Sequence, residues 1–183
     1  MRYRWLCPTI ALLVCASTAL LSAAEPHNAF LDGLRARKYY DTAIEYLEIV
    51  EKDPQTPAEF KVTILYEKAV TLQAAALASR TLEDQRKKFT QAEAYLKQFV
   101  KQSPDHPLAA TANSQTAKLL LDKAKAEYRQ ARDPSNQANK AELQKTARGY
   151  IGQARAMYQK AHDDYKIAWE AFPKFIPASE KEL

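Results

Sequence analysis

Cysteine is nearly missing from this 183-residue chain, and both copies, Cys7 and Cys15, lie within the first 24 residues. The remainder of the chain therefore has no thiol with which to form a disulfide or a thiolate metal site. Glycine is also scarce, at three residues. Frequent Ala, Lys, Gln, Glu and Leu instead favour helix almost everywhere.

The first 24 residues differ from the rest of the chain. Two arginines precede a largely apolar run from Leu6 to Leu21, and small residues follow at 22–24. We interpret residues 1–24 as a secretory signal peptide cleaved after about Ala24, which predicts an exported, periplasmic or secreted protein. Two alternatives stay open. The segment is an uncleaved anchor, close to the lower limit of roughly 20 residues for spanning a bilayer, or Cys15 carries a lipid.

The charge of the chain is mild once this segment is removed. Lys plus Arg falls from 27 to 25 while Asp plus Glu stays at 22, which leaves a net charge of +3. A small, evenly spread charge does not predict nucleic-acid binding. We therefore expect protein partners, no nucleic acid, and contact with a membrane only through the signal peptide or a lipid on Cys15.

Hydrophobic residues at helical spacing predict six helices in three hairpins. Their approximate ranges are 28–37, 41–52, 57–79, 82–102, 107–132 and 138–171. Thr56, Pro57 and Glu59 predict a capping box at the start of the third helix. Thr81 and His106 are expected to cap the fourth and fifth helices, and 133–137 is expected to be a loop. The expected inward residues of the last helix are Leu143, Tyr150, Ala154, Tyr158, Ala161 and Tyr165.

One eight-residue pattern occurs twice. Residues 40–47 read YDTAIEYL and residues 89–96 read FTQAEAYL, and a proline follows each, at Pro54 and Pro104. A looser third copy reads Tyr158, Ala161, Tyr165, Pro173. Internal repeats on this scale are typical of stacked helical hairpins, because one hairpin cannot bury its apolar stripe alone.

These repeats resemble the tetratricopeptide repeat (TPR) family, which places Ala, an aromatic residue or Leu, another Ala and Pro at fixed steps in the second helix of each unit. The segment 99–109, FVKQSPDHPLA, is similar to the junction between repeats in periplasmic proteins of the bacterial envelope. The resemblance implies an all-α fold of about three TPR-like antiparallel hairpins over residues 25–173, stacked as a short right-handed solenoid, with an irregular tail at 174–183. The matching positions are Ala43, Leu47, Val50 and Pro54, then Ala92, Leu96, Phe99 and Pro104, then Ala161, Tyr165, Ala168 and Pro173.

The sequence offers little for catalysis or metal binding. His27, His106 and His162 are scattered, and His162 shares its helix with two aspartates that cannot easily converge on one ion. The stretch Gly149-Tyr150-Ile151-Gly152 is similar to the loop of an RNA-binding KH module, but no strands flank it. We interpret the two glycines as points of close approach to a neighbouring helix. No catalytic residue, cofactor or metal site is predicted.

The function expected is therefore that of a non-catalytic scaffold for protein–protein interaction in the cell envelope. In the resembled family the first helix of each hairpin lines a concave surface, which implies a candidate partner site at Lys61, Lys68, Gln115, Lys118 and Asp122. An ordinary solvated helix face is the alternative for these residues. Two other functions stay open: a structural protein that self-assembles or forms the first module of a larger envelope protein, and an accessory domain of an enzyme acting on envelope polymers.

Overall fold

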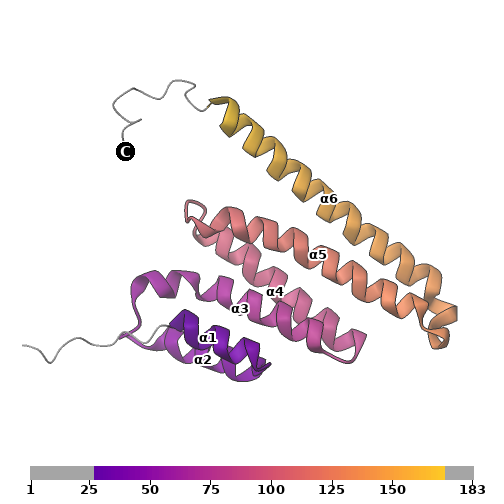
Figure 1. The fold of residues 1–183 in the computed structure, drawn as a ribbon, viewed down its shortest axis with the longest axis horizontal. Helices are drawn as coiled ribbons and strands as arrows, with labels where there is room; N and C mark the ends of the chain where they lie inside the picture. Colours follow the sequence, from indigo (N-terminus) through magenta and orange to yellow (C-terminus); the bar gives the residue numbers. More distant parts are fainter. Residues whose placement is uncertain (1–26, 172–183) are drawn as a thin grey trace, which may run out of the picture.

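The computed structural model describes residues 27–171, so the expected signal peptide and the tail after Ala171 lie outside the described residues. Within this range the chain is helical throughout and contains no strand. The predicted all-α class and the six helices are confirmed, with boundaries that differ from the predicted ones by one or two residues (Figure 1). The elements are α1 (His27–Ala36), α2 (Tyr40–Lys52), α3 (Ala58–Ala78), α4 (Leu82–Gln102), α5 (Leu108–Arg132), η1 (Pro134–Asn139) and α6 (Lys140–Ala171).

The caps predicted at Thr81 and His106 form. The Thr81 hydroxyl accepts a hydrogen bond from the backbone N–H of Asp84 at 3.2 Å, and the His106 Nδ1 accepts one from the N–H of Leu108 at 3.1 Å. The predicted capping box at α3 is wrong. The Thr56 hydroxyl is buried without a hydrogen-bond partner, and α3 begins after Pro57 with no side-chain cap.

The turn between α1 and α2 places a lysine in the left-handed region. Lys38 has φ 63°. Its N–H donates to the carbonyl of Arg35 at 3.0 Å, and the N–H of Tyr39 donates to the carbonyl of Leu34 at 2.9 Å. This pair of bonds is the Schellman closure of a helix, in which glycine usually occupies the left-handed position. Lys38 therefore has a backbone conformation that glycine adopts more readily than lysine.

The predicted loop at 133–137 is instead the start of a short 3₁₀ helix, η1, which leads directly into α6. The carboxylate of Asp133 accepts hydrogen bonds from both the N–H and the hydroxyl of Ser135, at 2.9 and 2.7 Å. An aspartate capping its own turn in this way accounts for the ordered start. Pro134 lies where it needs no donor.

The two close copies of the repeated pattern occupy equivalent positions in the core. Ala43, Leu47 and Val50 of α2 are buried in one hydrophobic cluster with residues of α1 and α3. The second copy supplies the matching residues of α4 to the other cluster, which also involves α3 and α5. These are Ala92, Leu96 and Phe99, all fully buried.

The third, looser copy does not form an equivalent core. Tyr158 was expected to point inward but is 43% exposed, and Ala161 is only half-buried. The side chain of Tyr165 lies outside the described set. The buried residues of α6 are earlier in the helix, at Leu143, Ala147 and Ala154, because α5 packs along this earlier part.

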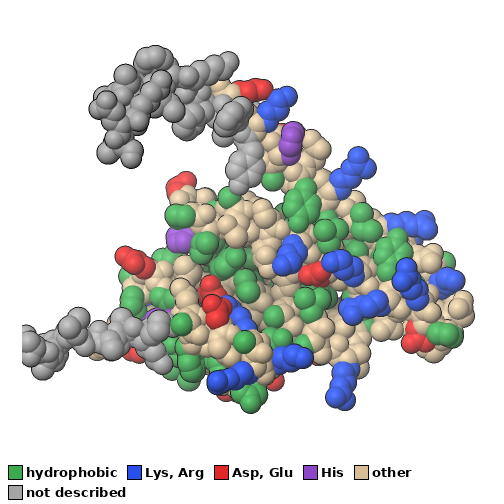
Figure 2. Space-filling view, viewed as in Figure 1, with side chains coloured by type: hydrophobic (Ala, Val, Ile, Leu, Met, Phe, Trp, Pro, Cys, Tyr) green, Lys and Arg blue, Asp and Glu red, His purple; other side chains and the backbone are tan. Residues whose placement is uncertain are grey.

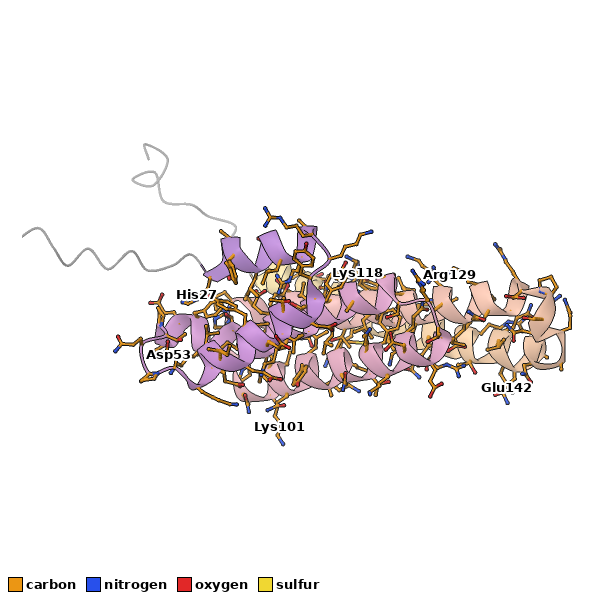
Figure 3. All side chains as sticks on the ribbon, turned by 90° about the horizontal axis from the view of Figure 1, so that it is seen from below. His27, Asp53, Lys101, Lys118, Arg129 and Glu142 are labelled. Atoms are coloured by element: carbon orange, nitrogen blue, oxygen red, sulfur yellow. The ribbon has the colours of Figure 1, made fainter. Side chains whose placement is uncertain are left out.

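The helices stack in chain order (Figure 1). Each packs on the next one, and α1 also contacts α3, which in turn contacts α5. Among the described residues, the backbones of α2 and α4, and of α4 and α6, do not approach one another. The odd-numbered helices are therefore closer together than the even-numbered ones. We call the side that α1, α3 and α5 present the odd-helix face; Figure 3 shows α1 on the same side as Lys118 and Arg129, opposite Lys101 of α4.

Ion pairs with a buried or half-buried partner link the helices. Each has its N···O distance between 2.5 and 2.7 Å, and together they connect α1 to α3, α2 to α3 and α4 to α5. The pairs are Arg35–Glu67, Lys68–Glu51, Arg86–Glu127 and Lys123–Glu93. Removing one partner from such a pair leaves a charge without compensation in a poorly solvated place, so these pairs help to fix how the hairpins align.

Candidate functional site

A row of four basic side chains runs along α5. Lys118, Lys125, Arg129 and Arg132 are separated by seven, four and three residues, and all four are exposed. At about 100° per residue they occupy a strip roughly 60° wide on the helix. Figure 2 shows Lys and Arg side chains gathered on this face over α5 and α6, with few acidic ones between them. We call these four residues the basic row.

Helix-dipole stabilisation explains only part of the row. Arg129 and Arg132 lie in the last turn of α5, where a cation is favoured by the helix dipole. Lys118 and Lys125 lie in the middle of the helix, where the dipole has little effect. The helix dipole therefore does not explain why all four residues lie on one strip, and the strip is a candidate surface for an acidic ligand.

A groove of about 580 Å³ lies beside the basic row. Leu77, near the end of α3, is 46% exposed and forms an apolar wall. Tyr128 of α5 is half-buried and adds an aromatic surface with a polar end. The remaining lining residues are Asp122, Lys125, Arg129 and Arg132. The groove thus combines three cations with two side chains that can bury apolar surface.

A chain of polar side chains connects α3 to α5 beside this groove. The Gln115 Nε2 donates to the Gln73 Oε1 at 2.7 Å, and the Gln73 Nε2 donates to the Asp122 Oδ2 at 2.9 Å. Lys125 contacts the other oxygen of Asp122 at 3.3 Å. Gln73 and Asp122 are buried, so both need these partners. Because Asp122 is already occupied by Gln73 and Lys125, it neutralises little of the basic row.

Of the predicted partner residues on α5, Lys118 is exposed, Gln115 is half-buried, and Asp122 is buried beneath the groove that it lines. Lys68 does not lie at this surface, because its ammonium pairs with Glu51 of α2 at 2.7 Å and lies 5.8 Å from the centre of the Tyr95 ring of α4. Its side chain is 7% exposed, so it is neither available to a partner nor part of a solvated face. Lys61, two turns earlier on the same side of α3, is half-buried.

The sequence analysis missed Lys125, Arg129 and Arg132. Their signal was present in the spacing, since with Lys118 they repeat at steps of seven, four and three in a helix that was predicted correctly. Gln73 and Leu77 carried no comparable signal. Gln73 is one of several polar residues of α3 and Leu77 one of several apolar ones, and the role of each depends on how α3 lies against α5.

A second polar cluster lies between α4, α5 and α6. The guanidinium of Arg86 donates to both carboxylate oxygens of Glu127, at 2.7 and 2.6 Å, and Glu127 is almost fully buried. Lys123 pairs with Glu93 at 2.5 Å and lies 5.4 Å from the centre of the Tyr150 ring. Burial raises the pKa of the Tyr150 phenol, and nearby Glu127 adds to the effect.

Charges within this second cluster compensate one another. Burial alone would raise the pKa of Glu93, but the hydrogen bonds from Lys123 and Lys97 outweigh it and the pKa is lowered. Glu93 is thus held ionised between two lysines, a state that suits an ion pair rather than a general acid. The cluster joins α4 to α5.

The described residues 27–171 contain no group of three or more His, Cys, Asp or Glu side chains able to hold one metal ion. The His162 Nδ1 lies 3.2 Å from the Oδ1 of the neighbouring Asp163, in an exposed position. Within the same range, no helix combines the length and apolarity needed to cross a membrane. Comparison with protein-family models, with curated proteins and with solved structures found no match to this chain.

Proposed function

We propose that this protein is a non-catalytic scaffold that binds an acidic, extended segment of a protein partner in the groove between α3 and α5. The observation that carries this proposal is the basic row, three of whose members have no ion-pair partner among the described residues. A surface that keeps unpaired cations beside an exposed Leu77 is suited to a ligand that has both carboxylates and an apolar side chain.

The length of the row sets the size of the ligand. Lys118 and Arg132 are fourteen residues apart, or about 21 Å along the helix axis. An extended peptide covers that distance with about six or seven residues. Acidic residues near each end of such a segment would meet Lys118 and the pair Arg129 and Arg132, and an apolar residue between them would meet Leu77 and Tyr128.

The architecture supports a repeat scaffold of the TPR-like kind. The equivalent burial of Ala43 and Ala92, and the closer spacing of the odd-numbered helices, are what a short curved stack of hairpins requires. On this basis we propose that the odd-helix face is the concave, partner-binding side. We also propose that the protein is exported and acts in the cell envelope, which rests on the signal-like residues 1–24.

Peptide binding tests the proposal. A fluorescent peptide of about ten residues, with Asp and Glu flanking a central Leu, is expected to bind more tightly at low than at high salt. Reversal of two charges in Lys125→Glu/Arg129→Glu should weaken binding at least tenfold. The matched control reverses two exposed lysines of α4 on the opposite side, Lys87→Glu/Lys101→Glu, and should bind like the parent protein.

The same variants serve as baits in affinity purification from an envelope fraction, where only the α5 variant should lose its specific partners. Equal binding of a peptide in which Asn and Gln replace the acids would contradict the charge argument. Unchanged binding by the α5 variant would remove the groove from the site.

A further inference from the structure

The outer face of α6, directed away from α5, is basic and uncovered. Residues 144–162 contain no acidic residue, whereas Lys145, Arg148, Arg155 and Lys160 are all exposed and have no ion-pair partner among the described residues. An exposed helix surface usually mixes both signs of charge, which gives i,i+4 support. Over about five turns, residues 144–162 carry only positive charges and so cannot form stabilising i,i+4 ion pairs with one another.

Two glycines lie on this same face. Gly149 and Gly152 are exposed, and a Cβ added at either one would meet nothing within 4 Å. The expectation that they mark close contact with a neighbouring helix is therefore wrong within this chain. Glycine in a helix interior is unfavourable relative to alanine, and no fold contact in the described residues accounts for it here.

The outer face of α2 has the opposite character. Three acidic residues lie within one half of the helix circumference and are exposed: Asp41, Glu45 and Glu48. None of them has an ion-pair partner among residues 27–171. Ile49 lies beside them and is 66% exposed, the highest value for a large hydrophobic side chain in the described part of the chain. This strip carries three acids and one base, the exposed Lys52 in the last turn of α2, together with an apolar side chain.

We infer that the α2 face of one copy packs on the α6 face of a second copy. The charges are complementary, and Ile49 is the side chain that would enter the open space over Gly149 and Gly152. The lengths also agree, because the thirteen residues of α2 extend over about 20 Å and residues 145–160 over about 24 Å. Within one molecule the two helices make no contact and lie at opposite edges of the stack (Figure 1), so the match can be used only between molecules.

The contact is head to tail, because its two surfaces differ. A heterologous contact of this kind extends into an open chain or closes into a ring. One helix pair buries a small area, so the association is weak, and its dependence on charge makes it sensitive to salt. It uses neither the basic row nor the groove, and it is therefore independent of the proposed partner site.

Sedimentation velocity of the protein from about 1 µM to about 1 mM tests the inference over the range in which weak contacts dissociate. The mean mass should rise with concentration. The Kd for self-association should be about tenfold higher at high salt, where charges are screened, than at low salt. A monomer over the whole range would overturn the inference. So would association that high salt strengthens, since that indicates an apolar contact.

Two variants separate the faces. Glu45→Lys/Glu48→Lys disables the α2 face, and Lys145→Glu/Arg148→Glu disables the α6 face. Each variant alone should show at least a tenfold higher Kd for self-association. Mixed in equal amounts, they should associate again, because the first keeps its α6 face and the second its α2 face, and the two reversed faces are also opposite in charge. Circular dichroism verifies that both remain helical, as expected for exposed positions.

The control Lys87→Glu/Lys101→Glu should associate like the parent protein. If the equal mixture stays monomeric while both variants are folded, the head-to-tail pairing is wrong. Self-association of either variant at the parental strength is equally decisive against it. Loss of association in the control variant would assign the contact to α4 instead.

Discussion

Replacement of Arg86 by methionine should produce the largest loss of stability among single changes at a half-exposed position. Arg86 supplies two hydrogen bonds to the carboxylate of Glu127, whose side chain is only 1% exposed. In Arg86→Met the aliphatic stem is retained, so the packing changes little. The carboxylate, however, loses its cation and both donors in a place that water reaches poorly.

The expected loss follows from that burial. Removing one partner of a fully buried ion pair costs about 3–5 kcal/mol. The Arg86 side chain is 51% exposed, so water can enter from its side and reduce the penalty. We therefore expect Arg86→Met to lower the free energy of unfolding by about 2–3 kcal/mol near neutral pH. The double variant Arg86→Met/Glu127→Met removes both charges and should recover most of this loss.

Urea unfolding followed by the helical circular-dichroism signal measures these values, with the midpoint shifting at an unchanged slope. The matched control is Lys97→Met, which breaks the exposed i,i+4 pair with Glu93 and should cost only about 0.3–0.5 kcal/mol. If Arg86→Met is no more destabilised than Lys97→Met, the Arg86–Glu127 pair does not hold α4 to α5 as argued. A double variant that is less stable than the single one would also refute the reasoning.

Four further outcomes are expected from the same unfolding assay. Lys38→Gly should stabilise the protein by about 1 kcal/mol, since Lys38 has φ 63°; an equal gain from glycine at exposed Arg37 would refute this cause. Thr56→Val should be neutral or stabilising by about 1 kcal/mol, because it removes a buried hydroxyl without a partner. Gly149→Ala should stabilise by about 0.5–1 kcal/mol, because its Cβ meets open space. The pKa of Glu93 is lowered in the folded protein. Ionised Glu93 therefore contributes fully to stability above its unfolded pKa of about 4.3, and this contribution is lost as the pH falls through the folded pKa. Glu93→Gln should flatten the fall in stability below about pH 4.5.

The helices were predictable because their signals are local. Apolar spacing and the prolines gave the six ranges, and the Thr81 and His106 caps depend on residues within three positions of the helix start. The same local rule failed at Thr56, whose buried hydroxyl has no hydrogen-bond partner although α3 begins directly after Pro57.

The candidate site was predictable only in part, because a side chain's surroundings depend on non-local packing. Gln115, Lys118 and Asp122 are at the groove since α5 presents them on the side of α3. Lys68 has the same kind of sequence context, yet Glu51 and Tyr95 cover it, and those residues belong to α2 and α4. Which side of α3 faces α2 is set by the packing of whole hairpins, and spacing within α3 does not encode it.

The exposure of the third copy of the repeated pattern, in α6, could not be predicted from the sequence for a related reason. Tyr158 fits the repeated pattern, but it is exposed because no further helix of the described chain lies over this part of α6. A repeat pattern reports which residues are suited to burial, whereas burial itself requires a neighbour to be present.

The arrangement of charge separates the parts of this molecule that hold it together from the parts that are open to others. Arg86, Lys123 and Lys68 reach inward, and each has a carboxylate on a different helix. Several unpaired acids instead lie together on the outer face of α2, and several unpaired bases lie together on α5 and α6. A net charge of +3 for the chain without its first 24 residues conceals this polarity, which is why composition alone gave no reason to expect a charged surface. Fold stability gains little from unpaired charges of one sign in the middle of a helix, where the helix dipole has little effect, so their segregation is better explained by contacts with other molecules.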